Sequence, residues 1–136
     1  MLRKKTATYA LLALYEIAQQ QRGSSNPAGV RASDIAQKHK LPKAYAAKIL
    51  SQMANAGVLH SDRGPRGGFR LNRAINDISL YDVFDSVGAV VGSKSKGPFI
   101  KGLPPSLQST VTRAYGEAAD ALKEVFARVT MTEMLT

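Results

Sequence analysis

One segment constrains the fold of this 136-residue chain more than any other. It is a basic, glycine-rich turn between residues that favour strands, with the sequence Arg63-Gly64-Pro65-Arg66-Gly67-Gly68-Phe69-Arg70-Leu71. Consecutive glycines reach backbone conformations that other residues avoid, and the proline stiffens its side of the loop. We therefore expect a β-hairpin whose strands cover residues 58–61 and 68–71 and whose tip carries arginine side chains.

Two short helix patterns precede this hairpin. The first begins near Ser33 and ends before Pro42, and the second covers residues 43–56 and stops at Gly57. Four apolar residues of the second helix recur at helical spacing and are expected to face inward: Ala46, Ile49, Leu50 and Met53. Two helices joined by a tight turn and followed by a hairpin predict a winged helix-turn-helix, a mainly α fold with a small β-hairpin wing.

The opposite face of the second helix is free for a partner. Lysine and glutamine side chains can reach base edges or phosphates there, and the small alanines between them allow close approach to a groove wall. The candidate DNA-binding residues on this face are Lys43, Tyr45, Lys48 and Gln52. Taken alone, the same pattern also fits an ordinary solvated helix face.

Positive charge is confined to the first half of the chain. Residues 1–70 contain 12 Lys/Arg against 3 Asp/Glu, whereas residues 71–136 contain 7 of each, so the whole net charge of +9 lies with the helix pair and the hairpin. Phosphate neutralisation requires such an excess at the binding segment. The distribution favours nucleic acid as the partner over an anionic membrane surface or charge that serves solubility.

The remaining composition excludes several function classes. The chain has no cysteine, which excludes disulfides and thiol catalysis, and only two histidines, which leaves a metal site little support. No nucleophile–base pair or paired carboxylate site is recognisable, and the glycine-rich turn lacks the spacing of a nucleotide-binding loop, so we expect no enzyme and no cofactor. No stretch approaches the roughly 20 apolar residues of a membrane span, and we expect a cytoplasmic protein.

The second half of the chain predicts a long helix. Ser79 and Asp82 form a capping pair for a short helix, and the glycine- and proline-rich residues 88–105 read as a flexible loop. A helix over residues 106–129 follows, longer than a small domain needs for its own core. We expect it to pair with a second copy of the chain, although packing within one chain is the alternative. The expected dimerisation residues are Leu12, Tyr15, Leu107, Val111, Ala114, Ala118, Leu122, Val125 and Val129.

Several of these segments together resemble the Rrf2 family of bacterial regulators, which includes IscR, NsrR and CymR. The resemblance covers nearly the whole chain and is most specific in the hairpin and in the later Ile78-Ser79-Leu80-Tyr81-Asp82-Val83 helix. It implies a homodimeric winged-helix transcription factor, usually a repressor, that binds double-stranded DNA. The third helix would enter the major groove and the wing the minor groove. By this resemblance Tyr45 and Lys48 match base-contact positions.

The resemblance also assigns roles to residues of the first helix and of the hairpin. Lys5, Thr6 and Tyr9 match phosphate-side positions, and the wing positions are Arg63, Pro65, Arg66 and Arg70. Two departures from the family pattern limit what can be carried over. The loop that holds three cluster-binding cysteines in many relatives has none here, and Ala46-Ala47-Lys48 replaces a Leu-Glu-Gln sequence. We therefore expect no iron–sulfur cluster and a different operator.

The predicted organisation is a DNA-binding domain over residues 1–87, a flexible loop over 88–105, and a dimerisation helix with a tail over 106–136. The predicted function is sequence-specific regulation of transcription by a homodimer. A winged-helix module for RNA or protein contacts is the alternative. The signal stays open between a small-molecule effector, a protein effector and no effector at all.

Overall fold

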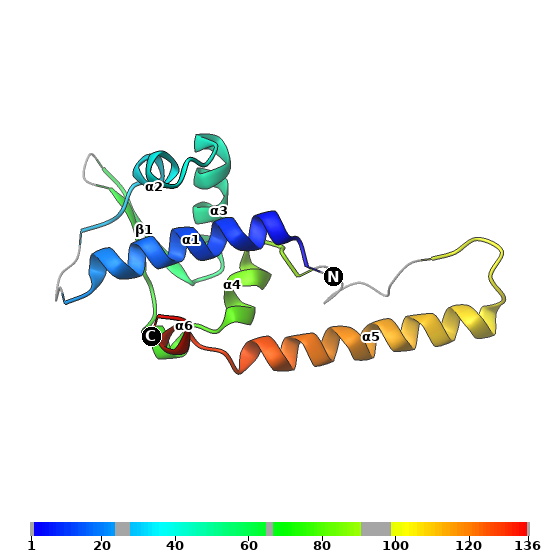
Figure 1. The fold of residues 1–136 in the computed structure, drawn as a ribbon. Coiled ribbons are helices and arrows are strands. Elements are labelled where there is room, and N and C mark those ends of the chain that lie inside the picture. The colour runs from blue at the N-terminus through cyan, green and yellow to red at the C-terminus, as the bar shows by residue number, and fades with distance from the viewer. Residues whose placement is uncertain (1, 24–27, 65–66, 91–98, 136) are drawn as a thin grey trace.

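The computed structural model describes residues 2–23, 28–64, 67–90 and 99–135 (Figure 1). Within these ranges the chain forms six α-helices, one short 3-10 helix and a two-stranded antiparallel sheet. In chain order they are α1 (Lys4–Gln21), α2 (Ala32–His39), α3 (Lys43–Asn55), β1 (Leu59–Asp62), β2 (Gly68–Leu71), η1 (Ile75–Asp77), α4 (Leu80–Ser86), α5 (Pro105–Ala127) and α6 (Met131–Met134).

The core is built from the inward faces of α1 and α3, closed by α2, α4 and the base of the hairpin. The four apolar residues of α3 that the sequence predicts to face inward are all buried: Ala46, Ile49, Leu50 and Met53. On α1, Leu14 and Ile17 are buried against them. The predicted fold class is confirmed: the chain is a winged helix-turn-helix that is mainly helical with one small hairpin.

The backbone at Val30 pairs with the hairpin and stabilises it. Strand β1 pairs with β2 in the register Leu59 to Leu71, and Val30 pairs with Phe69 through two backbone hydrogen bonds of 2.9 and 2.8 Å. This pairing brings the backbone of residues 29–30 so close to Gly68 that a β-carbon there would lie 2.8 Å from the Val30 carbonyl. A glycine at position 68 is thus required by packing, whereas the positive φ of this turn, +103°, belongs to Gly64. Pro65 and Arg66 lie outside the described residues.

Helix α4 begins at the predicted capping pair. The Ser79 hydroxyl accepts a hydrogen bond from the Asp82 amide at 3.0 Å, and the Asp82 carboxylate accepts one from the Ser79 amide at 3.0 Å. The apolar residues Val83 and Phe84 of this helix are buried. Residues 91–98 of the predicted loop after it lie outside the described residues.

Helix α5 is long, and little of it is covered by its own chain. Ala119 is its one buried residue, and Phe126 packs on Phe84 with the ring centroids 5.3 Å apart. Figure 1 shows that the end of α5 near α4 and α6 lies beside the other helices, while its first turns extend away from them. No helix in the described part of the chain is both long and apolar enough to span a lipid bilayer.

The chain turns back after α5 into α6, a helix that the sequence did not predict. Backbone hydrogen bonds of 2.8 and 2.9 Å join Leu80 to Val129 and Met131 to Ile78, and the Met131 side chain is buried in the core. Four residues are too few to show a helical period, and the helix depends on these contacts with segments far away in sequence.

Candidate nucleic-acid interface

The predicted reading face of α3 is exposed and basic. Lys43 and Lys48 are exposed, and neither takes part in an ion pair within the described part of the chain, while Gln52 is half-buried. In Figure 1 the hairpin, α2 and α3 all lie on the opposite side of α1 from α5. The candidate interface and the long helix thus occupy different sides of the molecule.

Tyr45 is not free on this face, because it is joined to the start of α1. Its hydroxyl lies 2.6 Å from the hydroxyl of Thr6, and its ring packs edge-on against Tyr9 with centroids 5.4 Å apart. The ammonium group of Lys5 lies 5.8 Å from the centre of the Tyr9 ring. The structure therefore brings four predicted site residues together, and it gives Tyr45 a part in holding α3 against α1.

The hairpin presents Arg63 and holds Arg70 in an ion pair. Arg63 is exposed at the end of β1. The Arg70 guanidinium donates two hydrogen bonds to the Asp62 carboxylate, at 2.6 and 3.0 Å, and His60 Nε2 lies 3.3 Å from the same carboxylate. The hydrogen bonds from Arg70 lower the pKa of Asp62, and Asp62 in turn raises the pKa of Arg70. Arg70 thus joins the two strands of the wing near the turn, a contact that the sequence did not predict.

A second charged cluster joins α1 to α2 below the reading face. Glu16 is buried, and its carboxylate accepts hydrogen bonds from Lys38 at 2.8 Å and from Gln20 at 3.1 Å; His39 Nε2 lies 3.2 Å away. These interactions, with Lys38 the largest, lower the pKa of Glu16 to about 2. The signal in the sequence was a glutamate beside the inward apolar residues of the first helix. Sequence analysis alone gave it no role.

The predicted dimerisation residues differ in how far their own chain covers them. Leu122 packs on the core of its own chain. Leu107, Val125 and Tyr15 are about half exposed, at 51%, 49% and 47%. The remaining residues are partly or fully exposed: Leu12, Val111, Ala114, Ala118 and Val129. A largely apolar groove of about 430 Å³ lies between α1 and α6 and includes Leu12 and Tyr15 in its lining.

Comparison with known proteins places this architecture in a family. The model of the Rrf2 family, described as an iron-dependent transcriptional regulator, matches residues 3–136. The chain belongs to the Rrf2 family. Two curated relatives are HTH-type transcriptional regulators. One, described as rrf2-like, from Rhodobacter capsulatus is 31% identical over 89% of this chain and 76% of its own length. The other, from Aquifex aeolicus, is 33% identical over 65% of this chain and 58% of its own length.

Solved structures of this family share the fold. CymR, the global cysteine regulator of B. subtilis, superposes with a TM-score of 0.66 at 22% identity, covering 96% of this chain and 92% of CymR. An IscR structure from T. potens superposes with a TM-score of 0.64 at 22% identity, covering 96% of this chain and 82% of that one. At this identity the likeness establishes the winged-helix architecture, and function needs separate argument.

The residues of this Rrf2 protein do not fit an iron–sulfur cluster. Cluster iron is held by cysteine thiolates, with histidine as a partial substitute in some centres. The chain has no cysteine and only two histidines, His39 and His60. Both lie beside carboxylates in the clusters described above. No group of three histidine, aspartate or glutamate side chains that could hold a metal ion occurs among the described residues.

Proposed function

We propose that this Rrf2 protein is a sequence-specific DNA-binding repressor that acts in the cytoplasm as a homodimer and without an iron–sulfur cluster. The observation that carries the proposal is the exposed basic face of α3, with Lys43 and Lys48 unpaired within the described chain, beside a hairpin that presents Arg63. Helix α3 would lie in the major groove, and the wing would follow the adjacent minor groove. Repression requires only that the bound dimer occupies a promoter.

The ordering of the interface supports DNA reading by α3. Base contacts discriminate only when the reading helix is held at a fixed depth and angle, and phosphate contacts set that register. The Thr6–Tyr45 hydrogen bond and the Tyr9–Tyr45 ring contact tie the first turn of α1 to the first turns of α3. Lys5 and Thr6 on α1 would bind backbone phosphates and so fix the depth of α3 in the groove.

The exposed half of α5 supports a homodimer. Leu107 and Val125 on α5 and Tyr15 on α1 are large apolar side chains about half exposed to water. A second copy that covered them would place two reading heads about a twofold axis, which matches a pseudo-palindromic operator. The groove between α1 and α6 offers a complementary apolar surface for such a partner.

The decisive experiment is selection of genomic fragments by the purified protein at a fixed moderate salt concentration, followed by footprinting. We expect a short pseudo-palindrome. Lys48→Ala should lower affinity for it about tenfold or more and relax preference at the base it contacts. Arg63→Ala should weaken binding to all sequences and reduce the salt dependence by roughly one counterion. Lys101→Ala, an exposed lysine beyond the winged helix, is the matched control.

Other outcomes of this selection would contradict the proposal. Equal operator affinity of the Lys48→Ala protein and the Lys101→Ala control would show that α3 does not contact the bases. Binding that depended only on salt and never on sequence would make the basic half a general electrostatic surface. Preference for RNA in a competition with duplex DNA would favour an RNA-binding module. Transcription from a promoter carrying the selected site should fall when the protein is added, and a rise would contradict repression.

A further inference from the structure

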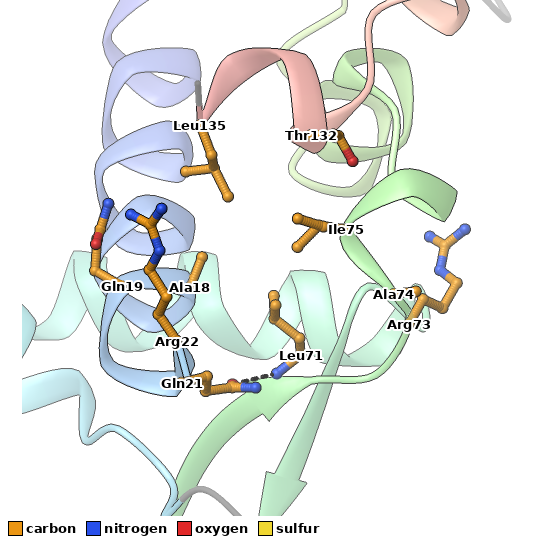
Figure 2. Close-up of a pocket in the computed structure, with 10 residues that line it drawn as sticks. All are labelled: Ala18, Gln19, Gln21, Arg22, Leu71, Arg73, Ala74, Ile75, Thr132 and Leu135. Atoms are coloured by element: carbon orange, nitrogen blue, oxygen red, sulfur yellow. Dashed lines mark hydrogen bonds between the residues drawn. The ribbon is translucent and has the colours of Figure 1, made fainter. Parts of the chain in front are cut away.

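A second cavity lies between the end of α1, strand β2, η1 and α6, away from the face of α3. It has a volume of about 420 Å³ (Figure 2). Its apolar lining includes Leu71 at the end of β2, Ile75 on η1 and Leu135 after α6. Pockets that bind small molecules have volumes of roughly 300–1,000 Å³ and combine an apolar wall with a few polar groups. The cavity meets both conditions.

The polar side chains that line this cavity differ in whether they already have hydrogen-bond or ion-pair partners. Figure 2 shows the Arg22 and Gln19 side chains on the α1 side of the cavity, whose lining also includes Leu135. Neither side chain has a hydrogen bond or ion pair with another described residue. The Arg73 guanidinium is turned outward on the far side, and its Nη1 donates to the Asp77 carbonyl at 3.2 Å and the Asp82 carboxylate at 3.4 Å, while its Nε is buried without a partner among the described residues. Arg22, an exposed residue, is therefore the cation at this cavity whose guanidinium has no partner in the described part of the chain.

A guanidinium beside an apolar wall selects a particular ligand chemistry. The flat guanidinium fork matches a carboxylate, to which it donates two parallel hydrogen bonds, and the neighbouring Gln19 amide can donate a third. Leu71, Ile75 and Leu135 would cover an aliphatic or aromatic body on the other side. The combination favours an organic acid with one charged end over an apolar molecule or a small inorganic anion.

The lining of the cavity comes from three segments: the end of α1, the wing strand β2 and the end of α6. The Gln21 side-chain carbonyl accepts a hydrogen bond from the Leu71 amide at 2.7 Å, so the end of α1 is joined directly to the wing strand β2. Leu135 belongs to the segment that returns from α5 to the core. A ligand in contact with Leu71 and Leu135 therefore touches the base of the wing and the end of α6 at once.

We propose that this cavity binds a small organic acid with an apolar body, whose carboxylate pairs with Arg22, and that the bound acid changes the affinity for DNA. A ligand shifts such an equilibrium by the difference in its affinity for the two states of the protein. The ligand site is inferred from the lining of the cavity alone. The effect on DNA affinity rests on the proposed function.

The binding step is tested by calorimetric titration of the full-length protein with hexanoate and with phenylacetate. Hexan-1-ol supplies the apolar body without the charge, and acetate supplies the charge without the body. We expect saturable binding of both acids and at least tenfold weaker binding of the alcohol and of acetate. Arg22→Gln should weaken hexanoate binding at least tenfold. Arg128→Gln, an exposed arginine outside the cavity lining, is the matched control and should leave it unchanged.

Amide chemical shifts locate the bound acid independently of affinity. Hexanoate should shift the Leu71 amide, which donates to Gln21, and leave the Leu50 amide in the core of α3 unshifted. The absence of saturable binding of both acids would overturn the proposal. Equal hexanoate affinity of the Arg22→Gln and Arg128→Gln proteins would overturn it as well.

The DNA step is measured separately, so that the two proposals can fail independently. Binding to the selected operator is titrated with and without saturating hexanoate at constant ionic strength. We expect a change of severalfold or more in the wild-type protein and none in Arg22→Gln. If hexanoate binds and the DNA affinity is unchanged, the proposed regulation is overturned and the proposed ligand site is retained. If the protein binds no DNA either with or without hexanoate, the proposed function is contradicted, while the proposed ligand site is not.

Discussion

Glu16 joins α1 to α2 through a buried carboxylate. Its carboxylate is buried and is held by Lys38, Gln20 and His39, all within 3.2 Å. A buried carboxylate is tolerated only when its oxygens are hydrogen-bonded and its charge is paired. Removal of the charge leaves these donors facing a poorer acceptor. The link that positions α2 beneath α3 should then weaken.

The pH dependence of folding should report this residue. The pKa of Glu16 is about 2 in the folded chain against an ordinary value of 4.5. Since the folded pKa is the lower one, the stabilisation is fully present above about pH 4.5 and is lost as the pH falls toward 2. Glu16→Gln should lower the free energy of unfolding at pH 7 by about 2 kcal/mol and remove part of the loss of stability between pH 5 and 2.

The measurement is urea unfolding at a series of pH values. Asp120→Asn is the control. Asp120 is an exposed acid on α5 that forms no ion pair within the described residues, so this variant should show the same dependence of stability on pH as the wild type. Parallel curves for Glu16→Gln and wild type below pH 5 would show that the ion pair with Lys38 does not contribute in solution.

Arg70 can act in the wing in two ways. It can bind a DNA phosphate itself, or it can stabilise the hairpin that presents Arg63 through its ion pair with Asp62. The two hydrogen bonds between them join the strands of the hairpin near its turn. Asp62→Asn removes a negative charge near the proposed DNA surface, so electrostatics alone predicts tighter binding. We expect severalfold weaker binding instead, because the hairpin loses its bidentate pair. Operator titrations of Asp62→Asn and Arg70→Gln would decide this, and tighter binding by Asp62→Asn would show that Arg70 acts mainly as a phosphate contact.

The hairpin as an element depends on a close backbone approach. A β-carbon at Gly68 would lie 2.8 Å from the carbonyl of Val30, which pairs with Phe69. Backbone atoms cannot move aside as a flexible side chain can, so Gly68→Ala should destabilise the protein by about 1–3 kcal/mol and weaken DNA binding through the wing. Chemical unfolding and operator titration measure the two effects.

Gly116 is the matched control for this substitution. It lies within α5, and a β-carbon there meets nothing within 4 Å in the described structure. Gly116→Ala should leave the stability unchanged or raise it by about 0.5–1 kcal/mol, since alanine is the better helix former. Equal effects of the two substitutions would mean that residues 29–30 do not pack on the hairpin in solution.

The elements that the sequence predicted correctly are those defined by neighbouring residues. The spacing of Ala46 and Met53 gave the buried side of α3, Ser79 and Asp82 gave the start of α4, and the double glycine gave the hairpin. In each case the deciding interaction lies within about eight residues of sequence. Periodicity, capping and turn chemistry are local properties, so a single sequence suffices to read them.

The contacts that sequence analysis missed join segments far apart in the chain. Tyr45 meets Thr6 across 39 positions, and Glu16 meets Lys38 across 22. Such pairs depend on how the helices cross, which periodicity does not specify. Asp62 and Arg70 are closer in sequence, but the orientation of their side chains follows from the hairpin register. Tyr45 illustrates the consequence: a residue that sequence analysis assigned to base contact is also a packing residue.

At the scale of the whole molecule, the candidate DNA interface and the proposed dimerisation helix α5 lie on different sides of α1. The hairpin and α3 lie on one side of α1, and α5 lies on the other, with its first turns extended beyond the winged helix (Figure 1). All the net positive charge lies in the half of the sequence that forms the winged helix. A partner on α5 would therefore bring two such halves together without meeting the charge that each uses for DNA.

The proposed homodimer can be tested on the exposed side of α5. Leu107 and Val111 occupy one side of the first turns of α5, and both are at least partly exposed in the single chain. Substitution of both by aspartate places two charges in the expected interface, where burial without partners is costly. We expect the wild type to sediment as a dimer at micromolar concentration and the Leu107→Asp/Val111→Asp protein as a monomer with an unchanged helical content. Ser109→Asp, on the opposite side of the helix, should stay dimeric.

Operator binding connects the dimer to function. Two reading heads related by a twofold axis bind half-sites about 34 Å apart, and each head alone makes only half of the phosphate contacts. The monomeric double variant should therefore bind an isolated half-site as the wild type does, lose most of its affinity for the full operator, and show about half the salt dependence. Full operator affinity in a protein that sediments as a monomer would show that one winged helix suffices, and the exposed apolar side of α5 would then have to be explained by a different partner.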